Sequence, residues 1–306
     1  MARTRYASDR GLTSRMLLTM FLLGLVYVVF VGAFFVIAPK WGGVALAVAV
    51  VFLLAQYFFS DRLTLFAMHG REVSAEEAPE LHGVIDRIIA LSDAPKPRVA
   101  IADTDVPNAF ATGRNQKKAV VCVTTGLLRR LDPVELEGVL AHEMAHVAHK
   151  DVAVMTIASF LGVCAGLITR FGLEWGLWGG FNRRDSNDQN TGLILLAVVA
   201  VSAVAYAISF LLTRALSRYR ELSADRAAAL LTGRPSALAS ALTKVSGEIA
   251  RIPSRDLRSA EPFNAFFFAP AFTKGFSVSN LFSTHPSLDK RLAQLQKISA
   301  QLGRGE

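Results

Sequence analysis

The stretch LAHEMAHVAHK, residues 140–150, holds three of the six histidines of this chain. His142 and His146 are four residues apart, so on a helix their rings project from the same face about one turn apart. Two neutral imidazoles in this arrangement can occupy two corners of a tetrahedral Zn²⁺ site. Glu143 is adjacent to the first histidine, where its carboxylate can take a proton from a zinc-activated water without binding the ion. The stretch therefore predicts a zinc-dependent hydrolase centre.

Such a short pattern also arises by chance, and the alternative is an exposed helical face with incidental histidines. The residues around the pattern argue against this alternative, because most of them are apolar and predict a buried helix. Buried histidines need partners, which a metal site provides. The apolar neighbours are Val139, Leu140, Met144, Ala145 and Val147.

A catalytic zinc ion needs a third protein ligand and an open fourth position. His149, His285 and Glu221 are the candidates. His149 is disfavoured, because three ligands from one straight helix would be strained around one ion. Glu221 is favoured, and Asp225 shares its helical face, where it could accept the ring N–H of a ligating histidine. Spacing alone leaves open the alternative that these two carboxylates are a solvated acidic pair balanced by neighbouring arginines.

The elements around this centre include several membrane spans. The chain has 306 residues and a mean hydropathy of +0.37, which few soluble domains reach. Four windows without charge have about the length that crosses a bilayer. The weakest of them carries three hydroxyl side chains and could instead be a buried or re-entrant helix. The windows are residues 17–38, 41–59, 152–169 and 191–213.

Basic residues predict the orientation of these spans. Arginines precede the first span and follow the last, whereas Lys40 alone lies between the first two spans. Because positive charge marks cytoplasmic loops, both termini are expected in the cytoplasm. The net charge of +8 fits a cytoplasmic surface that lies on anionic lipid, and nothing in the sequence suggests nucleic acid as a partner.

The spans divide the chain into four parts. Residues 1–16 are a basic cytoplasmic N-terminus, residues 17–59 a transmembrane pair, and residues 152–213 a second pair with a short extracytoplasmic loop. Residues 60–151 and 214–306 are each short for a large core, so we expect them to form one cytoplasmic domain together. The predicted fold class is an α+β membrane protein, mostly helical, with four transmembrane helices and a small β-sheet.

Local signals place the motif within this domain. Ser74 and the acidic residues after it predict the start of a helix. Two apolar runs, residues 96–104 and 117–126, predict strands, with a further extended piece between them. Asp132 and Pro133 are a helix cap and a first helical residue, so they predict the start of the helix that carries the histidines.

The second soluble stretch begins as a continuation of the last span. That helix has no breaker before Gly233. Residues 253–286 are expected to be a loop with phenylalanines within residues 263–272. These either pack against the domain or form a flap that lines a substrate groove or touches lipid. A final helix is predicted at residues 286–302.

Four motifs, taken together and in this order between paired spans, resemble the HtpX membrane zinc endopeptidases, kin of the CAAX prenyl proteases. The resemblance covers nearly the whole chain, and it implies a zincin-like domain of the gluzincin type. The motifs are Asn108-Ala109-Phe110, His142-Glu143-x-x-His146, Glu221-x-x-x-Asp225 and Thr284-His285-Pro286.

The resemblance implies a role for each matching residue. His142, His146 and Glu221 match the ligands of one Zn²⁺ per chain, and Glu143 matches the general base. Asp225 matches the carboxylate that orients a ligand.

Three further residues match the substrate side of the family's site. Asn108 matches the asparagine that holds the substrate backbone on an edge strand, and we expect the strand at residues 120–124 to offer its edge to an extended peptide. His285 matches a histidine near the scissile carbonyl, where it could steady the oxyanion. Arg291 matches an arginine that supports this region.

The family implies a bacterial inner-membrane enzyme of protein quality control, with its catalytic domain in the cytoplasm and with membrane or misfolded proteins as substrates. A CAAX-type prenyl-protein protease is the nearest rival, but it needs a large intramembrane chamber walled by more spans. A non-catalytic membrane scaffold would be expected to lack Glu143 or a ligand, and all of these residues are present.

Overall fold

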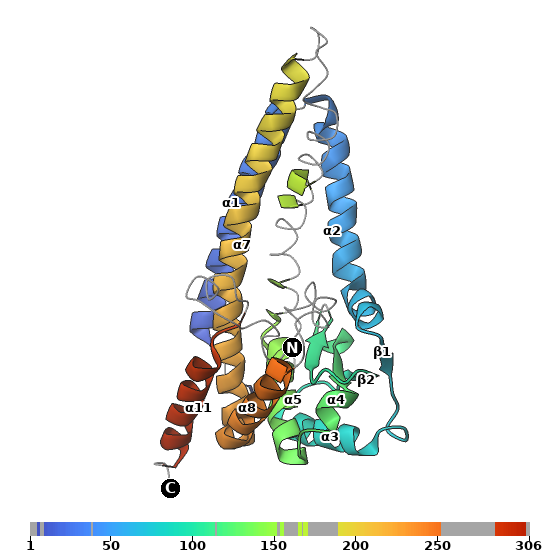
Figure 1. The fold of residues 1–306 in the computed structure, drawn as a ribbon, viewed down its shortest axis with the longest axis vertical. Helices are drawn as coiled ribbons and strands as arrows, with labels where there is room; N and C mark the ends of the chain where they lie inside the picture. Colours follow the sequence, from blue (N-terminus) through green and yellow to red (C-terminus); the bar gives the residue numbers. More distant parts are fainter. Residues whose placement is uncertain are drawn as a thin grey trace. The chain divides into compact units, whose positions relative to one another are not determined.

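Figure 1 shows the computed structural model of the chain. The chain divides into two compact units, which are described separately below. The predicted phenylalanine-rich loop and most of the third predicted span lie outside the described residues. The structure describes residues 5–6, 9–37, 39–113, 115–151, 154–155, 165–166, 168–170, 189–251 and 285–303.

One unit, residues 13–58 and 154–216, contains most of the long apolar helices. These are α1 (Arg10–Ile37), α2 (Pro39–Ala67) and the first part of α7 (Gln189–Thr232). Within this unit Leu23 of α1 packs with Leu212 of α7.

Two helices in the described part of the chain are long and apolar enough to cross a membrane. The candidate ranges, Arg10–Ala33 and Leu196–Thr232, each include an apolar window and contain most of the first and last predicted spans. The predicted span at residues 41–59 lies within the helix α2. The total of four spans remains a prediction.

The other unit, residues 1–12, 59–153 and 217–306, holds a four-stranded sheet. The strand order is β1-β2-β4-β3, with β2 parallel to β4 and both outer pairs antiparallel. The two strands predicted from apolar runs are confirmed as β2 and β4, and the extended piece between them as β3. The strands are β1 (Gly70–Glu72), β2 (Arg98–Ala102), β3 (Ala109–Thr112) and β4 (Val120–Thr124).

The central strand β4 differs from expectation in one respect. The prediction that it offers an edge to a peptide is wrong, because β2 and β3 pair with its two edges. All five of its residues are buried, as is typical of an apolar strand covered on both faces. Among the described residues, the edge strand on this side of the sheet is β3.

The helix α3 (Pro79–Ser92) begins five residues later than Ser74, the predicted cap. The Ser74 backbone N–H donates to a Glu77 carboxylate oxygen at 2.9 Å, within a turn that precedes the helix. Pro79 disfavours helical backbone at Ala78, whose φ of −140° and ψ of 64° lie outside the helical region, so the turn and the helix are separate.

The helix α5 (Pro133–Ala148) begins where the sequence predicts. The Asp132 side chain accepts hydrogen bonds from the backbone N–H groups of Val134 and Glu135, at 3.0 and 2.9 Å. The Glu135 carboxylate accepts the backbone N–H of Asp132 at 3.1 Å, which completes a capping box. These bonds fix the first turn of the helix that carries the histidines.

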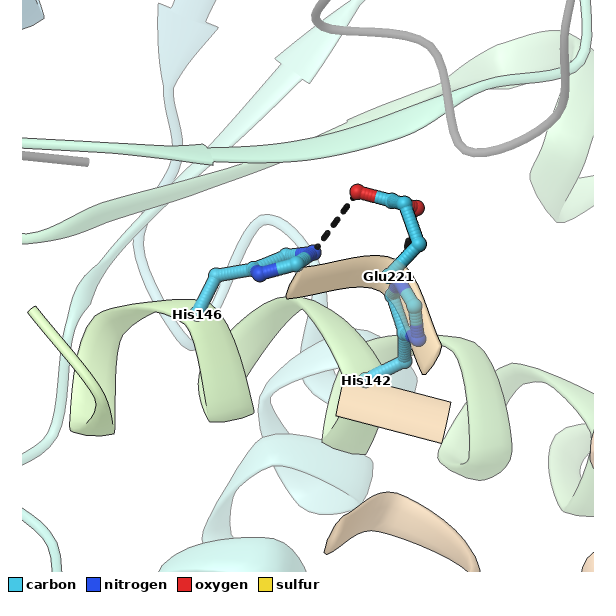
Figure 2. A group of neighbouring side chains, drawn as sticks. All are labelled: His142, His146 and Glu221. Carbon is cyan, nitrogen blue, oxygen red and sulfur yellow. Dashed lines mark ion pairs between the residues drawn. The ribbon is translucent and has the colours of Figure 1, made fainter. Parts of the chain in front are cut away.

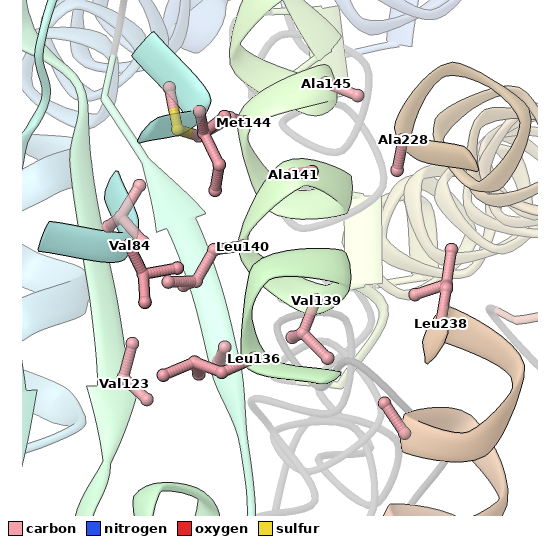
Figure 3. Packing of buried hydrophobic residues seen from close by; sticks show 14 of the residues in the cluster. Val84, Val123, Leu136, Val139, Leu140, Ala141, Met144, Ala145, Ala228 and Leu238 are labelled. Atoms are coloured by element: carbon pink, nitrogen blue, oxygen red, sulfur yellow. The ribbon is translucent and has the colours of Figure 1, made fainter. Parts of the chain in front are cut away.

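The helix α5 is the centre of the hydrophobic core, which accounts for the burial of its histidine face. Figure 3 shows Leu140 on the side of Val123 and the sheet, and Val139 on the side of Leu238 in α8 (Pro235–Arg251). Residues on both sides of α5 are buried, so little of its surface meets solvent.

The remaining helices complete this unit. The helix α7 ends at Thr232, and Gly233 follows with a φ of +65°, in the left-handed region that glycine adopts easily. The terminal helix α11 (Leu288–Leu302) begins two residues after the predicted start and packs against α8. A single short turn, α4 (Thr125–Leu128), follows β4.

Candidate metal centre

Three side chains from two helices converge in the core of this unit. His142 and His146 come from adjacent turns of α5, and Glu221 comes from α7 (Figure 2). One donor atom from each lies within 4.8 Å of the other two. All three side chains are buried, at 0%, 5% and 4% residual exposure.

The separations within the group fit a metal ion better than direct hydrogen bonds. His142 Nε2 lies 3.6 Å from one Glu221 carboxylate oxygen, and His146 Nε2 lies 3.4 Å from the other. Ordinary N–H···O bonds cluster near about 2.9–3.0 Å. Ligand atoms about 2.0–2.2 Å from a tetrahedral zinc ion lie about 3.3–3.6 Å apart. Two imidazoles and one carboxylate at this spacing therefore fit a divalent cation such as zinc.

A carboxylate orients each imidazole. His142 Nδ1 lies 2.9 Å from Asp225 Oδ1, and His146 Nδ1 lies 2.8 Å from Asp151 Oδ2. An Nδ1–H that donates to a carboxylate leaves Nε2 as the lone-pair nitrogen, which is the arrangement a ligating histidine needs. In both rings this Nε2 atom faces Glu221.

Asp151 was not anticipated from the sequence. It is fully buried and follows Lys150, whose φ of +61° turns the chain back after the end of α5. This turn brings Asp151 to His146, five residues earlier in the chain. The sequence pattern contains no helical spacing that signals such a contact.

Each of these aspartates is in turn paired with an arginine. Arg291 Nε and Nη2 donate to the two oxygens of Asp225 at 2.7 and 2.6 Å. Arg220 Nε lies 3.2 Å from Asp151 Oδ2. Arg291 was expected to support the region of His285. Its closest bonds run to Asp225 behind His142, and its Nη1 atom also lies 3.8 Å from the Glu221 oxygen next to His285.

Ionisation in this group follows from burial and opposite charge. Burial by itself raises the pKa of Glu221, but the charge of His285 and the nearby rings of His142 and His146 outweigh it, so that pKa lies well below its ordinary value. Burial lowers the pKa of His142 and His146, yet their carboxylate partners raise it by more, in His146 to about 9. Burial likewise opposes ionisation of Asp225, but its arginine partner holds the pKa of this carboxyl below its usual value. Without an ion, the carboxylates and the positively charged rings stabilise one another.

Glu143 lies beside this group and against the edge strand. Its Oε2 atom accepts the backbone N–H of Ala111 in β3 at 3.1 Å. Burial raises the pKa of Glu143, and the nearby histidines only partly oppose this effect. A carboxylate of raised pKa next to a metal site is better suited to take up a proton than an exposed one.

His285 and Asn108 lie in different surroundings. His285 Nδ1 lies 3.1 Å from a Glu221 carboxylate oxygen, so it belongs to the immediate environment of the candidate centre. Asn108 is buried directly before β3, and its carbonyl accepts the backbone N–H of Thr124 at 2.9 Å. His149, the disfavoured candidate ligand, is the residue that caps the C-terminus of α5 and is not in the group of three.

Comparison with known proteins identifies the family. The family model described as Peptidase family M48 matches residues 75–299, which is most of the chain and includes every residue of the candidate centre. The chain belongs to peptidase family M48. The prediction of a metallopeptidase that resembles the HtpX enzymes is thereby confirmed, and full-length relatives agree with it.

Two relatives match over almost their whole length. Protease HtpX homolog 1 of Streptomyces coelicolor is 64% identical over 98% of this chain and 97% of its own. Protease HtpX homolog of Moorella thermoacetica is 51% identical over 98% of both chains. The crystal structure of S. mikatae Ste24p has the same fold, with a TM-score of 0.52 at 17% identity over 94% of this chain and 67% of that one. The relatives and the two long apolar helices indicate a membrane protein.

Proposed function

We propose that this peptidase is a zinc-dependent endopeptidase in which His142, His146 and Glu221 hold one Zn²⁺ per chain. The observation that carries this proposal is the orientation of the two rings. Both Nδ1 atoms face buried aspartates, while both Nε2 atoms face the same carboxylate at 3.4 and 3.6 Å. Structural histidines in a core have no need of such a shared third partner, whereas zinc sites are built this way.

Glu143 is the proposed general base. A bound zinc ion supplies Lewis acidity, which lowers the pKa of a water molecule to about 7 and polarises a carbonyl group. The Glu143 carboxylate takes the proton of the attacking water and passes it to the leaving amine. Burial, which raises the pKa of Glu143, favours this proton uptake, and the Ala111 N–H holds the carboxylate in place.

The proposed substrate site is the edge of β3. Hydrogen-bonded pairs alternate along an antiparallel ladder, and the Thr124 N–H donates to Asn108, so the backbone groups of Ala109 and Ala111 point away from β4. The Ala111 N–H on this side donates to Glu143, and the Ala109 N–H is the donor proposed for a peptide. An extended peptide that pairs with this edge lies next to Glu143. In this scheme Asn108 holds the peptide backbone, as the family resemblance implies.

His285 is the proposed residue that stabilises the oxyanion of the reacting carbonyl, and Arg291 lies beside it. His285 lies 3.1 Å from a Glu221 oxygen, and Arg291 Nη1 lies 3.8 Å from the same oxygen. Both side chains are almost fully buried, where a hydrogen-bond donor held in place stabilises a developing oxyanion more strongly than in water. We assign His285 to the oxyanion and Arg291 to the support of Asp225.

We further propose a bacterial inner-membrane enzyme with four spans and a cytoplasmic catalytic domain that degrades membrane or misfolded proteins. The arginines before the first span and after the last support this orientation. The HtpX-type relatives and the apolar helices support the membrane location.

The substitution Glu143→Gln tests the general base. The purified variant is expected to retain zinc and to lose casein cleavage, because the amide keeps the size of the side chain but cannot accept a proton. Zinc content and cleavage are measured on the same preparation. Equal activity in the variant and the wild type would remove Glu143 from the mechanism.

The substitution Glu221→Ala tests the third ligand. Zinc occupancy is expected to fall, since the remaining protein ligands are the two imidazoles alone. His149→Ala is the matched control, because His149 lies on the same stretch but outside the group, and it should keep full occupancy. Unchanged zinc in Glu221→Ala would contradict the proposed ligand set.

A further inference from the structure

The first residues of the chain contact the helix that carries the two histidines. Tyr6 is 6% exposed and belongs to the same hydrophobic cluster as Leu140 and Ala141. Its hydroxyl donates a hydrogen bond to the carbonyl oxygen of Ala141 at 3.1 Å, one residue before His142. Burial raises the pKa of Tyr6, so the hydroxyl keeps its proton and remains a donor.

The same segment also contacts the helix that carries Glu221. Asp9 Oδ2 accepts the hydroxyl of Ser223 at 2.8 Å, and the Tyr219 hydroxyl lies 3.5 Å from Asp9 Oδ1. Tyr219 and Ser223 are each two residues from Glu221. At about 100° per residue they lie on the face of α7 opposite Glu221. Asp9 therefore holds α7 from behind its candidate ligand.

Asp9 has a second role that fixes it in place. Its Oδ1 atom accepts the backbone N–H of Leu12 at 2.8 Å, so it caps the start of α1. At Gly11 a side-chain carbon would come within 2.5 Å of the Tyr219 hydroxyl, so glycine permits the close approach to α7. At the other end of the segment, the Arg5 N–H donates to the Ser92 carbonyl at 2.7 Å.

We propose that residues 5–6 and 9–12 act as an N-terminal strap that positions α5 and α7 so that their three side chains meet around the metal ion, with Tyr6 and Asp9 as the positioning residues. The inference rests on the proposed zinc site. The three donors come from helices separated by a long stretch of chain, and local sequence cannot set their spacing. A metal site tolerates little error in this spacing, whereas the strap bonds to both helices within two residues of the ligands.

The test compares zinc release from full-length, detergent-solubilised protein into a chromophoric chelator. Tyr6→Phe removes only the hydroxyl, and Asp9→Ser keeps a helix cap but cannot also reach Ser223. Each is expected to weaken zinc retention about three- to tenfold, the usual scale for one hydrogen bond. Asp9→Asn should restore retention, because an amide can cap α1 and bond the Ser223 hydroxyl, which can rotate to accept.

The control is Arg5→Ala, which removes an exposed ion pair of the same segment with Asp93 and leaves both ligand helices untouched. The visible spectrum of the Co²⁺-substituted protein is the second readout, because it reports ligand geometry and does not follow stability. The spectrum should shift in Tyr6→Phe and Asp9→Ser and stay unchanged in Arg5→Ala.

Two results would overturn the inference. If both strap variants match the control in zinc release and cobalt spectrum, or lower only the Tm of the metal-free protein, the segment stabilises the fold without positioning the ligands. If the wild-type chain binds neither zinc nor cobalt, the proposed function fails and the strap fails with it.

Discussion

The two histidines of the candidate centre are held by the same kinds of group in different surroundings. Behind His142, Asp225 accepts two hydrogen bonds from Arg291, and both side chains are at most 1% exposed. Behind His146, Asp151 is equally buried, but Arg220 approaches one of its oxygens only and is 12% exposed.

This difference predicts unequal roles. A bidentate arginine–carboxylate pair is geometrically specific, and in a buried site neither partner can turn to water if the other is lost. A single contact from a partly exposed arginine is more adaptable, since water can replace it. We therefore expect the Asp225–Arg291 pair to contribute strongly to folding stability. We expect the Asp151–Arg220 pair to affect mainly the affinity for the metal.

The helix α7 links the two sides. It supplies Arg220, Glu221 and Asp225 within six positions. A single helical segment therefore contributes to both aspartate–arginine pairs behind the histidines, called the anchors below, and to the candidate ligand set. Arg291 comes from α11 and Asp151 from the turn after α5. A shift of α7 would thus disturb both rings together, which is why its attachment to other elements matters.

The largest effect is expected for Asp225→Ala. The variant leaves the buried Arg291 guanidinium without its carboxylate, which typically costs about 3–5 kcal/mol of folding free energy. It should also lose zinc, because His142 loses its orienting partner. Denaturant unfolding and metal analysis measure the two effects, with the exposed Asp86→Ala as control. A loss below about 1 kcal/mol would contradict the proposed role of this pair.

Asp151→Ala should act mainly on the metal. Removal of a carboxylate that orients a ligating histidine usually lowers metal affinity about 10–100-fold. The loss of stability should be smaller than in Asp225→Ala, because Arg220 can reach water. Competition with a chelator gives the affinity. If the two aspartate variants lose equal amounts of stability and of zinc, the two sides are equivalent and the comparison fails.

Lysine substitutions at the two arginines compare what each arginine contributes to folding stability. Arg291→Lys removes one of two charge-assisted hydrogen bonds at a buried site, and a loss of about 1.5 kcal/mol in stability is expected. Arg220→Lys keeps a single charged contact at a partly exposed site and should lose less than about 0.5 kcal/mol. Unfolding curves of the two variants, recorded under the same conditions, measure both losses of stability. A larger loss in Arg220→Lys than in Arg291→Lys would contradict the prediction.

The smallest expected effect on the metal is that of Asp132→Ala. This variant removes the cap of α5, at a typical cost of about 1 kcal/mol in stability, far from either anchor. Zinc affinity should stay at the wild-type value. A clear fall in affinity would show that general loosening of α5, and not the aspartates behind the rings, controls the site.

Local features of this fold were predicted well where the chemistry is local. The cap at Asp132 and the stop at Gly233 depend on a few neighbouring residues and are confirmed. The helix start predicted at Ser74 is wrong, because Pro79 disfavours helical backbone at Ala78 and so separates the turn at Ser74 from the helix α3. The edge predicted for residues 120–124 is wrong because strand pairing depends on segments far away in the chain.

Some residues of the candidate site could be predicted from sequence and others could not, because only some of their contacts are local. The spacing of His142 and His146 is a property of any helix, so their shared face could be inferred from sequence. Glu221 was favoured as the third ligand, but spacing alone left a solvated acidic pair as an equal alternative. Asp151 was missed because its contact with His146 depends on a left-handed backbone at Lys150.

The amino-acid sequence alone determined the chemistry that is available: which side chains can bind a metal, which of them share a helical face, and where the long apolar helices lie. These features follow from residue type and from the regular geometry of one helix. The tertiary structure decided which donors meet, which nitrogen of each ring faces the carboxylate, and which groups support the rings. Such contacts depend on the packing of helices that are distant in the chain, and short-range regularities do not specify that packing.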